Sequence, residues 1–246
     1  MRHPFRTNDD NMEQENKTHE LKEVTKEIFG WEDNRLFRTI KSLTINPGKV
    51  ISEYCKGEKQ KYLSPVIYFF GVTAIETYIA SASGLYDLML KEKLESIRKS
   101  LSDSKLNIDA SSAVDRMNTA FSFFFGEIGQ KMIIIPLLLI LTWLFYRKYN
   151  KSFKENSWFA LYTLGHATLL SIPFMAIWYV TSDMLVFTAF SFIIPLVYWI
   201  WASRQFYKLK LGRAILLRLV MFAVAMLTIG ALSSLMVSLT ILSAKR

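Results

Sequence analysis

Two ionisable side chains lie inside long apolar segments, where a charge has chemical consequences. Glu76 is near the middle of residues 65–83, and His166 lies within residues 158–180. An ionised side chain at the centre of a bilayer costs about 2.5–3.5 kcal/mol on insertion scales, so such a residue normally faces protein or water. Glu76 therefore has two interpretations: a pore-lining or proton-accepting carboxylate, or a protonated carboxyl group hydrogen-bonded to a neighbouring helix. Three side chains within residues 158–180 suit that hydrogen bond: Tyr162, Thr163 and His166.

His166 and two further polar positions in apolar segments favour packing over chemistry. His166 is interpreted as a packed polar group that pairs with Glu76 or a backbone carbonyl, in preference to a proton relay. Ser234 and Ser238 follow Gly230 at four-residue spacing, a stripe of small residues that lets helices approach closely. Packing within the chain is the favoured interpretation of this stripe, and a subunit contact or a hydroxyl-lined path is the alternative.

Nothing in the sequence indicates an enzyme, a metal site or a bound cofactor. Cys55 is the only cysteine, and the three histidines lie far apart. The H-E-x-x-H and G-x-S-x-G patterns do not occur, and the ten glycines are too dispersed for a phosphate-binding loop. We therefore predict no catalytic residue, no metal and no cofactor.

Long apolar segments must position Glu76 and His166. Apolar residues make up 51% of the 246 residues and gather into runs, and about 20 such residues cross a hydrocarbon core of about 30 Å. Residues 1–34 are polar and suggest no cleavable signal peptide. We predict an all-α polytopic membrane protein, with a cytoplasmic region at 1–64 and a transmembrane domain at 65–246. Its five spans are 65–83, 131–146, 158–180, 184–202 and 214–243.

The distribution of basic side chains orients the predicted spans in the membrane. Residues 35–62 contain seven Lys and Arg against two Glu, whereas residues 84–130 contain six basic and seven acidic side chains. Basic loops stay in the cytoplasm. The N-terminus is therefore predicted inside and the C-terminus outside, with a bilayer as the first partner.

Residues 35–65 are predicted to form a basic collar at the cytoplasmic end of the first span. A helix beginning near residue 35 has apolar and basic sides, and it either lies in the headgroup plane or packs on its own protein. The turn Asn46-Pro47-Gly48 and a short helix over 49–56 that ends at Gly57 follow, and then Ser64-Pro65 caps the first span. The apolar side is Leu36, Phe37, Ile40 and Leu43, and the basic side is Arg35, Arg38 and Lys41.

Residues 84–130 are too long for a simple connection and are predicted to form an extracytoplasmic helical hairpin. Apolar residues recur at helical spacing over 86–101 and again over 114–124. The apolar stripes are expected to meet each other or a neighbouring subunit.

The collar resembles an uncharacterised bacterial membrane family. The likeness rests on Arg38-Thr39 and Lys41, on Pro47–Tyr54 (P-G-K-V-I-x-E-Y), and on Gly57, Tyr62 and Pro65. It implies several membrane helices after the signature, in the bacterial inner membrane, and no assigned activity. Many members begin with a Cys-rich zinc ribbon that this sequence lacks.

In size and layout the chain is also similar to the membrane subunit of Hailong-type antiphage systems, an ion channel controlled by a DNA oligomer. The resemblance implies a homo-oligomeric channel or pore effector in antiphage defence. It also implies a nucleotide or single-stranded DNA ligand and a nucleotidyltransferase as partner gene product. A non-catalytic membrane anchor that recruits partner proteins is the alternative. The implied ligand contacts are Arg35, Arg38, Lys41, Lys59, Lys61, Arg147, Lys148, Arg204 and Lys208.

Overall fold

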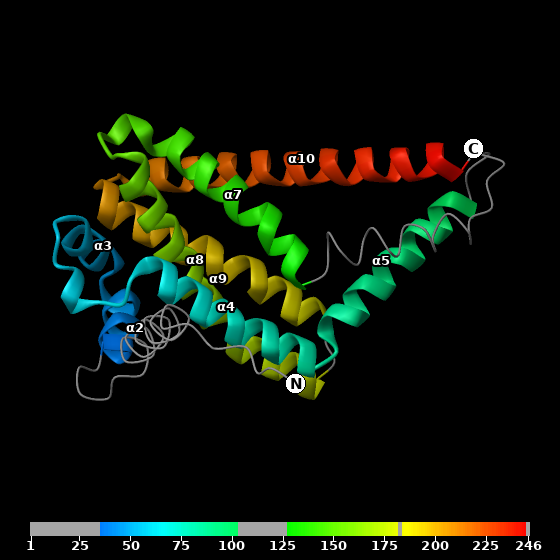
Figure 1. Ribbon diagram of the computed structural model, residues 1–246, viewed down its shortest axis with the longest axis horizontal. Helices are drawn as coiled ribbons and strands as arrows, with labels where there is room; N and C mark the ends of the chain where they lie inside the picture. The colour runs from blue at the N-terminus through cyan, green and yellow to red at the C-terminus, as the bar shows by residue number, and fades with distance from the viewer. Residues whose placement is uncertain (1–34, 103–126, 182–183, 245–246) are drawn as a thin grey trace, which may run out of the picture.

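The fold is helical throughout the part of the chain that the structure describes. A computed structural model describes residues 35–102, 127–181 and 184–244 (Figure 1). These residues form α-helices and short 3-10 helices without strands, which confirms the predicted all-α class. One predicted feature, the second helix of the outer hairpin over 114–124, lies outside the described residues.

The collar consists of α2 (Arg35–Ile45), α3 (Pro47–Cys55) and the 3-10 helix η1 (Lys59–Lys61). The predicted turn Asn46-Pro47-Gly48 is wrong, because α3 begins at Pro47 with Asn46 as its cap. Proline suits a first helical position, since its fixed φ is helical and its missing N–H has no helical partner there. Gly57 ends the collar helix as predicted, with φ +105°.

The long helices coincide with the predicted apolar segments. Ser64 Oγ accepts a hydrogen bond from Ile67 N–H (3.2 Å) and caps the first long helix, as predicted. Pro136, Pro173 and Pro195 each lie inside a helix that continues past the proline. In chain order the helices are α4 (Pro65–Ala82), α5 (Leu85–Ser102), α7 (Glu127–Tyr146), η2 (Arg147–Tyr149), α8 (Phe153–Thr181), α9 (Met184–Tyr207) and α10 (Leu211–Ala244).

Two segments of the described chain are long and apolar enough to cross a membrane by length and composition. These are Lys59–Ala82 and Leu211–Leu232. They contain α4 and the first two-thirds of α10, so they coincide with the first and fifth predicted spans. Both segments fit a membrane protein. Membrane crossing by α7, α8 and α9, and the orientation of the termini, stay predictions.

The helices pack as a bundle with the collar at one end. Helix α8 lies between α4 and α9, α10 packs along α9 and α7, and α3 packs on α9. Figure 1 shows the collar, the α7–α8 connection and the α9–α10 connection at the same end of the bundle. Helix α10 extends along the molecule well past α9 (Figure 1), since 34 residues make about 50 Å of α-helix.

Aromatic rings fill the core at the collar end. Tyr146, Phe159 and Trp199 are completely buried, and Tyr207 is nearly so. The Tyr146 and Tyr207 rings stack at 4.3 Å, and Phe159 meets the Trp199 ring edge-on at 5.4 Å. Large rings from three helices therefore fix the relative positions of α7, α8 and α9 at this end.

Candidate functional site

The collar is the candidate site, and its apolar side is packed inside the protein. Leu43, Val50, Ile51 and Tyr54 are buried in the main core, and Leu36 and Ile40 pack against it. The structure therefore supports packing on its own protein for the apolar side of α2. Phe37 departs from the predicted apolar side, because 71% of its surface is exposed.

Gly48 lets α3 lie directly against α9. Its N–H donates a hydrogen bond to Gln205 Oε1 at 3.0 Å. A Cβ atom at this position would stand 2.3 Å from Gln205 Cβ and 2.7 Å from the Gln205 carbonyl carbon. Because real atoms do not approach so closely, only glycine permits this contact.

Side-chain hydroxyls from three helices bind the backbone of the collar. Thr39 Oγ1 accepts a hydrogen bond from Leu63 N–H at 2.9 Å, and the Tyr162 hydroxyl donates to the Leu63 carbonyl. The Tyr198 hydroxyl donates to the Leu43 carbonyl at 3.0 Å. All of these bonds are buried, and leaving a buried backbone group unpaired costs about 1–3 kcal/mol. The bonds therefore tie α2 and the start of α4 to α8 and α9.

His166 joins the collar to two long helices. Its Nε2 lies 3.0 Å from Thr44 Oγ1 and its Nδ1 lies 2.7 Å from the Tyr68 hydroxyl. Thr44 donates its own proton to the Ile40 carbonyl at 2.8 Å, so Thr44 must accept from Nε2–H. Nδ1 then accepts from Tyr68, and His166 is the neutral Nε2–H tautomer. His166 is thus completely buried with a partner at each ring nitrogen, which supports its interpretation as a packed polar group.

Glu53 holds η1 against α3. Its carboxylate accepts hydrogen bonds from Lys61 Nζ (2.9 Å) and from the Tyr62 hydroxyl (2.7 Å). The bond from Lys61, followed by that from Tyr62, lowers the pKa of Glu53 below its ordinary value. Lys61 also pairs with Glu58 at 3.4 Å. One predicted ligand contact, Lys61, is therefore already engaged with two carboxylates.

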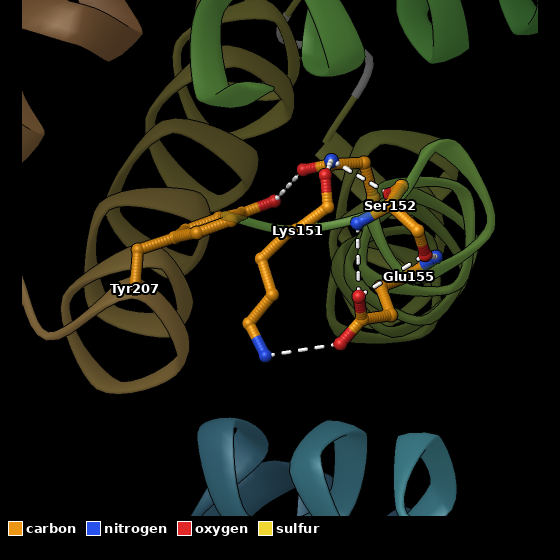
Figure 2. Close-up of polar contacts among 5 residues, drawn as sticks. Lys151, Ser152, Glu155 and Tyr207 are labelled. Carbon is orange, nitrogen blue, oxygen red and sulfur yellow. Dashed lines mark hydrogen bonds and ion pairs between the residues drawn. The ribbon is translucent and has the colours of Figure 1, made fainter. Parts of the chain in front are cut away.

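The start of α8 is capped by side chains that the sequence analysis missed (Figure 2). Ser152 N–H donates to Glu155 Oε2 (2.9 Å), and Glu155 N–H donates to Ser152 Oγ (3.2 Å). This reciprocal pair is a capping box, for which Ser and Glu three residues apart are the sequence signal. Lys151 Nζ binds Glu155 Oε1 at 3.0 Å, and the Tyr207 hydroxyl donates to Asn156 Oδ1 at 2.6 Å.

Glu155 is a carboxylate in its folded environment. Burial raises its pKa, but hydrogen bonds from the Ser152 backbone, from Lys151 and from the Ser152 hydroxyl together outweigh burial and leave the pKa below its ordinary value. The negative charge of Glu155 also acts on the nearby thiol of Cys55. Burial first, and Glu155 second, raise the pKa of the Cys55 thiol to about 12.

Glu76 lies half-buried on α4. Both ring nitrogens of His166 have other partners. The Tyr162 hydroxyl donates to Leu63, and Thr163 Oγ1 donates to the Phe159 carbonyl at 2.6 Å. The α8 side chains named for Glu76 thus have recorded partners of their own, and the pairing of Glu76 with them stays a prediction.

The small-residue stripe of α10 is exposed. Gly230, Ser234 and Ser238 all lie on the surface, and no atom from elsewhere in the chain approaches a Cβ built on Gly230. Ser238 Oγ donates to the Ser234 carbonyl at 2.9 Å, within the same helix. No other described helix packs on these three residues, so packing within the chain stays a prediction for this stripe. Helix α10 contacts α9 and α7 on another side.

The predicted basic contacts are spread over the collar end of the bundle. Lys59 lies over the Trp158 ring at 5.8 Å, and Arg147 and Lys148 lie over Trp143 and Tyr149 at 5.9 and 5.6 Å. Arg35 and Lys61 are half-buried. The exposed members of the set are Arg38, Lys41, Lys59, Arg147, Lys148, Arg204 and Lys208. The structure therefore gives a broadly basic surface with aromatic support, without gathering all nine side chains at one point.

Comparison with known proteins gives a family match over the collar, and that family has no described activity. A family described as a protein of unknown function (DUF3667) matches residues 33–76, which cover the collar and the first part of α4. No curated protein and no solved structure matches the chain. The chain is thus similar to that family over the segment that carries Gly48, Glu53 and Thr39.

Proposed function

We propose that the protein is an oligomeric channel or pore effector of the bacterial inner membrane, with five spans and a cytoplasmic N-terminus. The basic collar end would receive an anionic nucleotide or DNA oligomer and open or close the pore. A nucleotidyltransferase is the class of enzyme that would supply such a ligand. Antiphage defence is the setting in which this arrangement acts.

One observation carries the proposal: the collar is bonded directly to three long helices. Leu63 links Thr39 of α2 to Tyr162 of α8, His166 links α2 to α4, and Gly48 contacts α9. A ligand that displaces the collar must therefore displace those helices too. Glu76 lies two turns beyond Tyr68 on α4, within reach of such a movement.

The exposed stripe of α10 supports an oligomer. Gly230, Ser234 and Ser238 allow close helix approach, yet no other helix that the structure describes occupies them. Leu227 and Leu235 beside them are 73% and 56% exposed. A second copy packed on this face would bury these side chains, and one small subunit needs such neighbours to enclose a pathway.

The alternative function is a non-catalytic membrane anchor that recruits partner proteins. A specific observation favours it: most of the collar residues that carry the family likeness are used for packing. Pro47, Gly48, Val50, Ile51 and Tyr54 are buried, and Glu53 binds Lys61 and Tyr62. The likeness then reports how the collar folds and leaves the exposed basic side chains as a partner surface.

Membrane potential in cells after induced expression tests the two functions. The wild-type protein, Glu76→Gln and Glu92→Gln are compared at matched membrane levels, the last as an exposed control on α5. The channel proposal predicts depolarisation by the wild-type protein, an altered response with Glu76→Gln and an unaltered one with Glu92→Gln. A normal potential with well-inserted wild-type protein, both alone and with a nucleotidyltransferase co-expressed, would favour the anchor.

A further inference from the structure

Arg218 is a buried cation inside the bundle. It lies in the first third of α10 and only 7% of its surface is exposed. Its guanidinium carbon stands 4.4 Å from the centroid of the Trp199 ring on α9, a cation–π contact. Its Nε–H is buried without a hydrogen-bond partner, and no Asp or Glu of the described residues pairs with it.

The neighbours of Arg218 add further hydrogen-bond donors. The Trp199 indole N–H is also buried without a partner, and so is the Tyr146 hydroxyl. Tyr146 lies beside Arg218, Trp199 and Ser203. Ser203 donates its own proton to the Ile200 carbonyl at 2.9 Å, so the side-chain acceptors beside Arg218 are the hydroxyl oxygens of Ser203 and Tyr146. This group of α7, α9 and α10 side chains therefore has more donors than acceptors.

A buried guanidinium without an anion is unfavourable. A cation–π contact compensates only part of the hydration that burial removes. The residues that face Arg218 are aromatic and neutral, so the compensation within the chain is incomplete. The missing component is a group that is both anionic and rich in acceptor oxygens.

The surroundings of Arg218 identify the chemistry of that group. Arg213, one and a half turns earlier on α10, lies over the Tyr149 ring at 5.8 Å, and Tyr149 lies 6.2 Å from Tyr146. Both guanidinium groups therefore lie over aromatic rings, Arg213 over Tyr149 and Arg218 over Trp199. Arginine presents a planar fork of donors that matches phosphate oxygens. Arg218 follows Leu211 by seven residues, so it lies about 10 Å along the helix from its start.

We propose that Arg218 is the centre of a phosphate-binding site between α7, α9 and α10, with Arg213 at its outer edge. The ligand is a phosphate group, carried either by a membrane lipid or by a soluble molecule. The site differs from the collar and requires no pore, so it goes beyond the proposed function.

Lipid retention by the purified full-length chain tests the site. Native mass spectrometry is run in dodecyl maltoside with equal amounts of phosphatidylglycerol and diacylglycerol, which have similar tails but differ in phosphate. The wild-type chain is expected to retain phosphatidylglycerol about tenfold more than diacylglycerol, and Arg218→Met is expected to abolish the preference. Arg98→Gln removes an exposed arginine on α5, outside the site, and should leave the preference for phosphatidylglycerol unchanged.

A second arm separates the two sources of phosphate. Thermal unfolding is followed with millimolar inorganic phosphate or pyrophosphate and no added lipid. A higher midpoint for the wild-type chain that Arg218→Met loses means a soluble phosphate, whereas lipid retention without this shift means a lipid headgroup. Should Arg218→Met fail to fold, Arg218→Lys decides: it keeps the charge, loses the fork and should retain severalfold less of the phosphate ligand. Equal retention of both lipids by the wild-type chain, with no phosphate shift, would overturn the site.

Discussion

The collar end of the bundle and the far half of α10 differ in how far their side chains are buried and in where their polar groups find hydrogen-bond partners. At the collar end, Leu43, Tyr162 and His166 are completely buried and their polar groups are bonded within the chain. Along the far half of α10, Leu227 is 73% exposed and Ser238 bonds only to its own helix. The polar groups of the first region have partners on neighbouring helices, whereas no other described helix covers the exposed face of the second.

Two glycines show the difference at single positions. A Cβ on Gly48 would collide with Gln205, whereas a Cβ on Gly230 would meet open space. The first glycine is required by a contact inside the chain. No contact among the described residues requires the second. Substitutions in the two regions should therefore have unequal effects on the unfolding of one chain.

The largest effect is expected at Gly48. Gly48→Ala should lower the free energy of unfolding by about 2–4 kcal/mol, because α3 must move off α9 and the Gln205 hydrogen bond is lost. The measurement is unfolding in mild detergent followed by circular dichroism. Gly212→Ala is the control, since no atom crowds that position, and it should change stability by less than about 1 kcal/mol. Equal losses of stability in the two variants would contradict the inference that the contact of Gly48 with α9 requires glycine.

His166→Phe should cost about 2–3 kcal/mol of unfolding free energy. Phenylalanine fills a similar volume but leaves the Tyr68 hydroxyl without an acceptor and removes the donor to Thr44. The matched change in the other region is Ser238→Ala, which should lie within about 0.5 kcal/mol of wild type. A His166→Phe protein as stable as wild type would mean that the collar bonds contribute little.

The capping box of α8 should contribute less. Ser152→Ala removes the acceptor for Glu155 N–H, and such a loss costs about 1 kcal/mol. Thermal unfolding of the variant checks the value. Ser157→Ala is the comparison within the same helix, because its hydroxyl only back-bonds to the Phe153 carbonyl at 2.9 Å. If Ser157→Ala cost as much as Ser152→Ala, the cap would have no special role.

The collar end should also lose stability in acid. The folded-state pKa of Glu53 is depressed, so its contribution is fully present above the ordinary carboxyl pKa and is lost as the pH falls through the lower folded value. Unfolding midpoints measured downward from pH 6 should therefore decline below about pH 4.5. Glu53→Gln should be less stable at pH 6 and show a shallower decline. Parallel curves for the two proteins would contradict the pairing with Lys61 and Tyr62.

The smallest effect on unfolding is expected on α10. Ser234→Leu should change the stability of one chain by less than about 0.5 kcal/mol, since this serine is exposed. Chemical cross-linking in native membranes should nevertheless show fewer oligomers, because leucine prevents close helix approach. An unchanged cross-linking pattern would leave lipid as the partner of this face.

The sequence predicted the helices well because each rests on local signals. Apolar runs placed the long helices, and Ser64-Pro65 and Gly57 placed two boundaries. Asn46-Pro47-Gly48 was misread as a turn, since proline and glycine are common both in turns and at helix starts. Ser152 and Glu155 were overlooked although their spacing is a local signal.

The site was harder to predict because its bonds join residues far apart in the sequence. The partners of His166 are 98 and 122 residues away, and the partner of Gly48 is 157 residues away. Periodicity tells which side of a helix is apolar but not which neighbour covers it. For the same reason the exposed stripe of α10 and the burial of Arg218 required the three-dimensional structure.

The most direct test of the docked collar is amide hydrogen exchange of residues 36–64 in the full-length chain. The account predicts that α3 and Leu63 exchange slowly in the wild-type protein. Gly48→Ala should speed their exchange at least about 100-fold, while α8 stays protected, because each 1.4 kcal/mol of lost docking changes the rate about tenfold. Exchange of the wild-type collar at the rate of a free peptide would show that it is not docked on α4, α8 and α9, and would contradict the account.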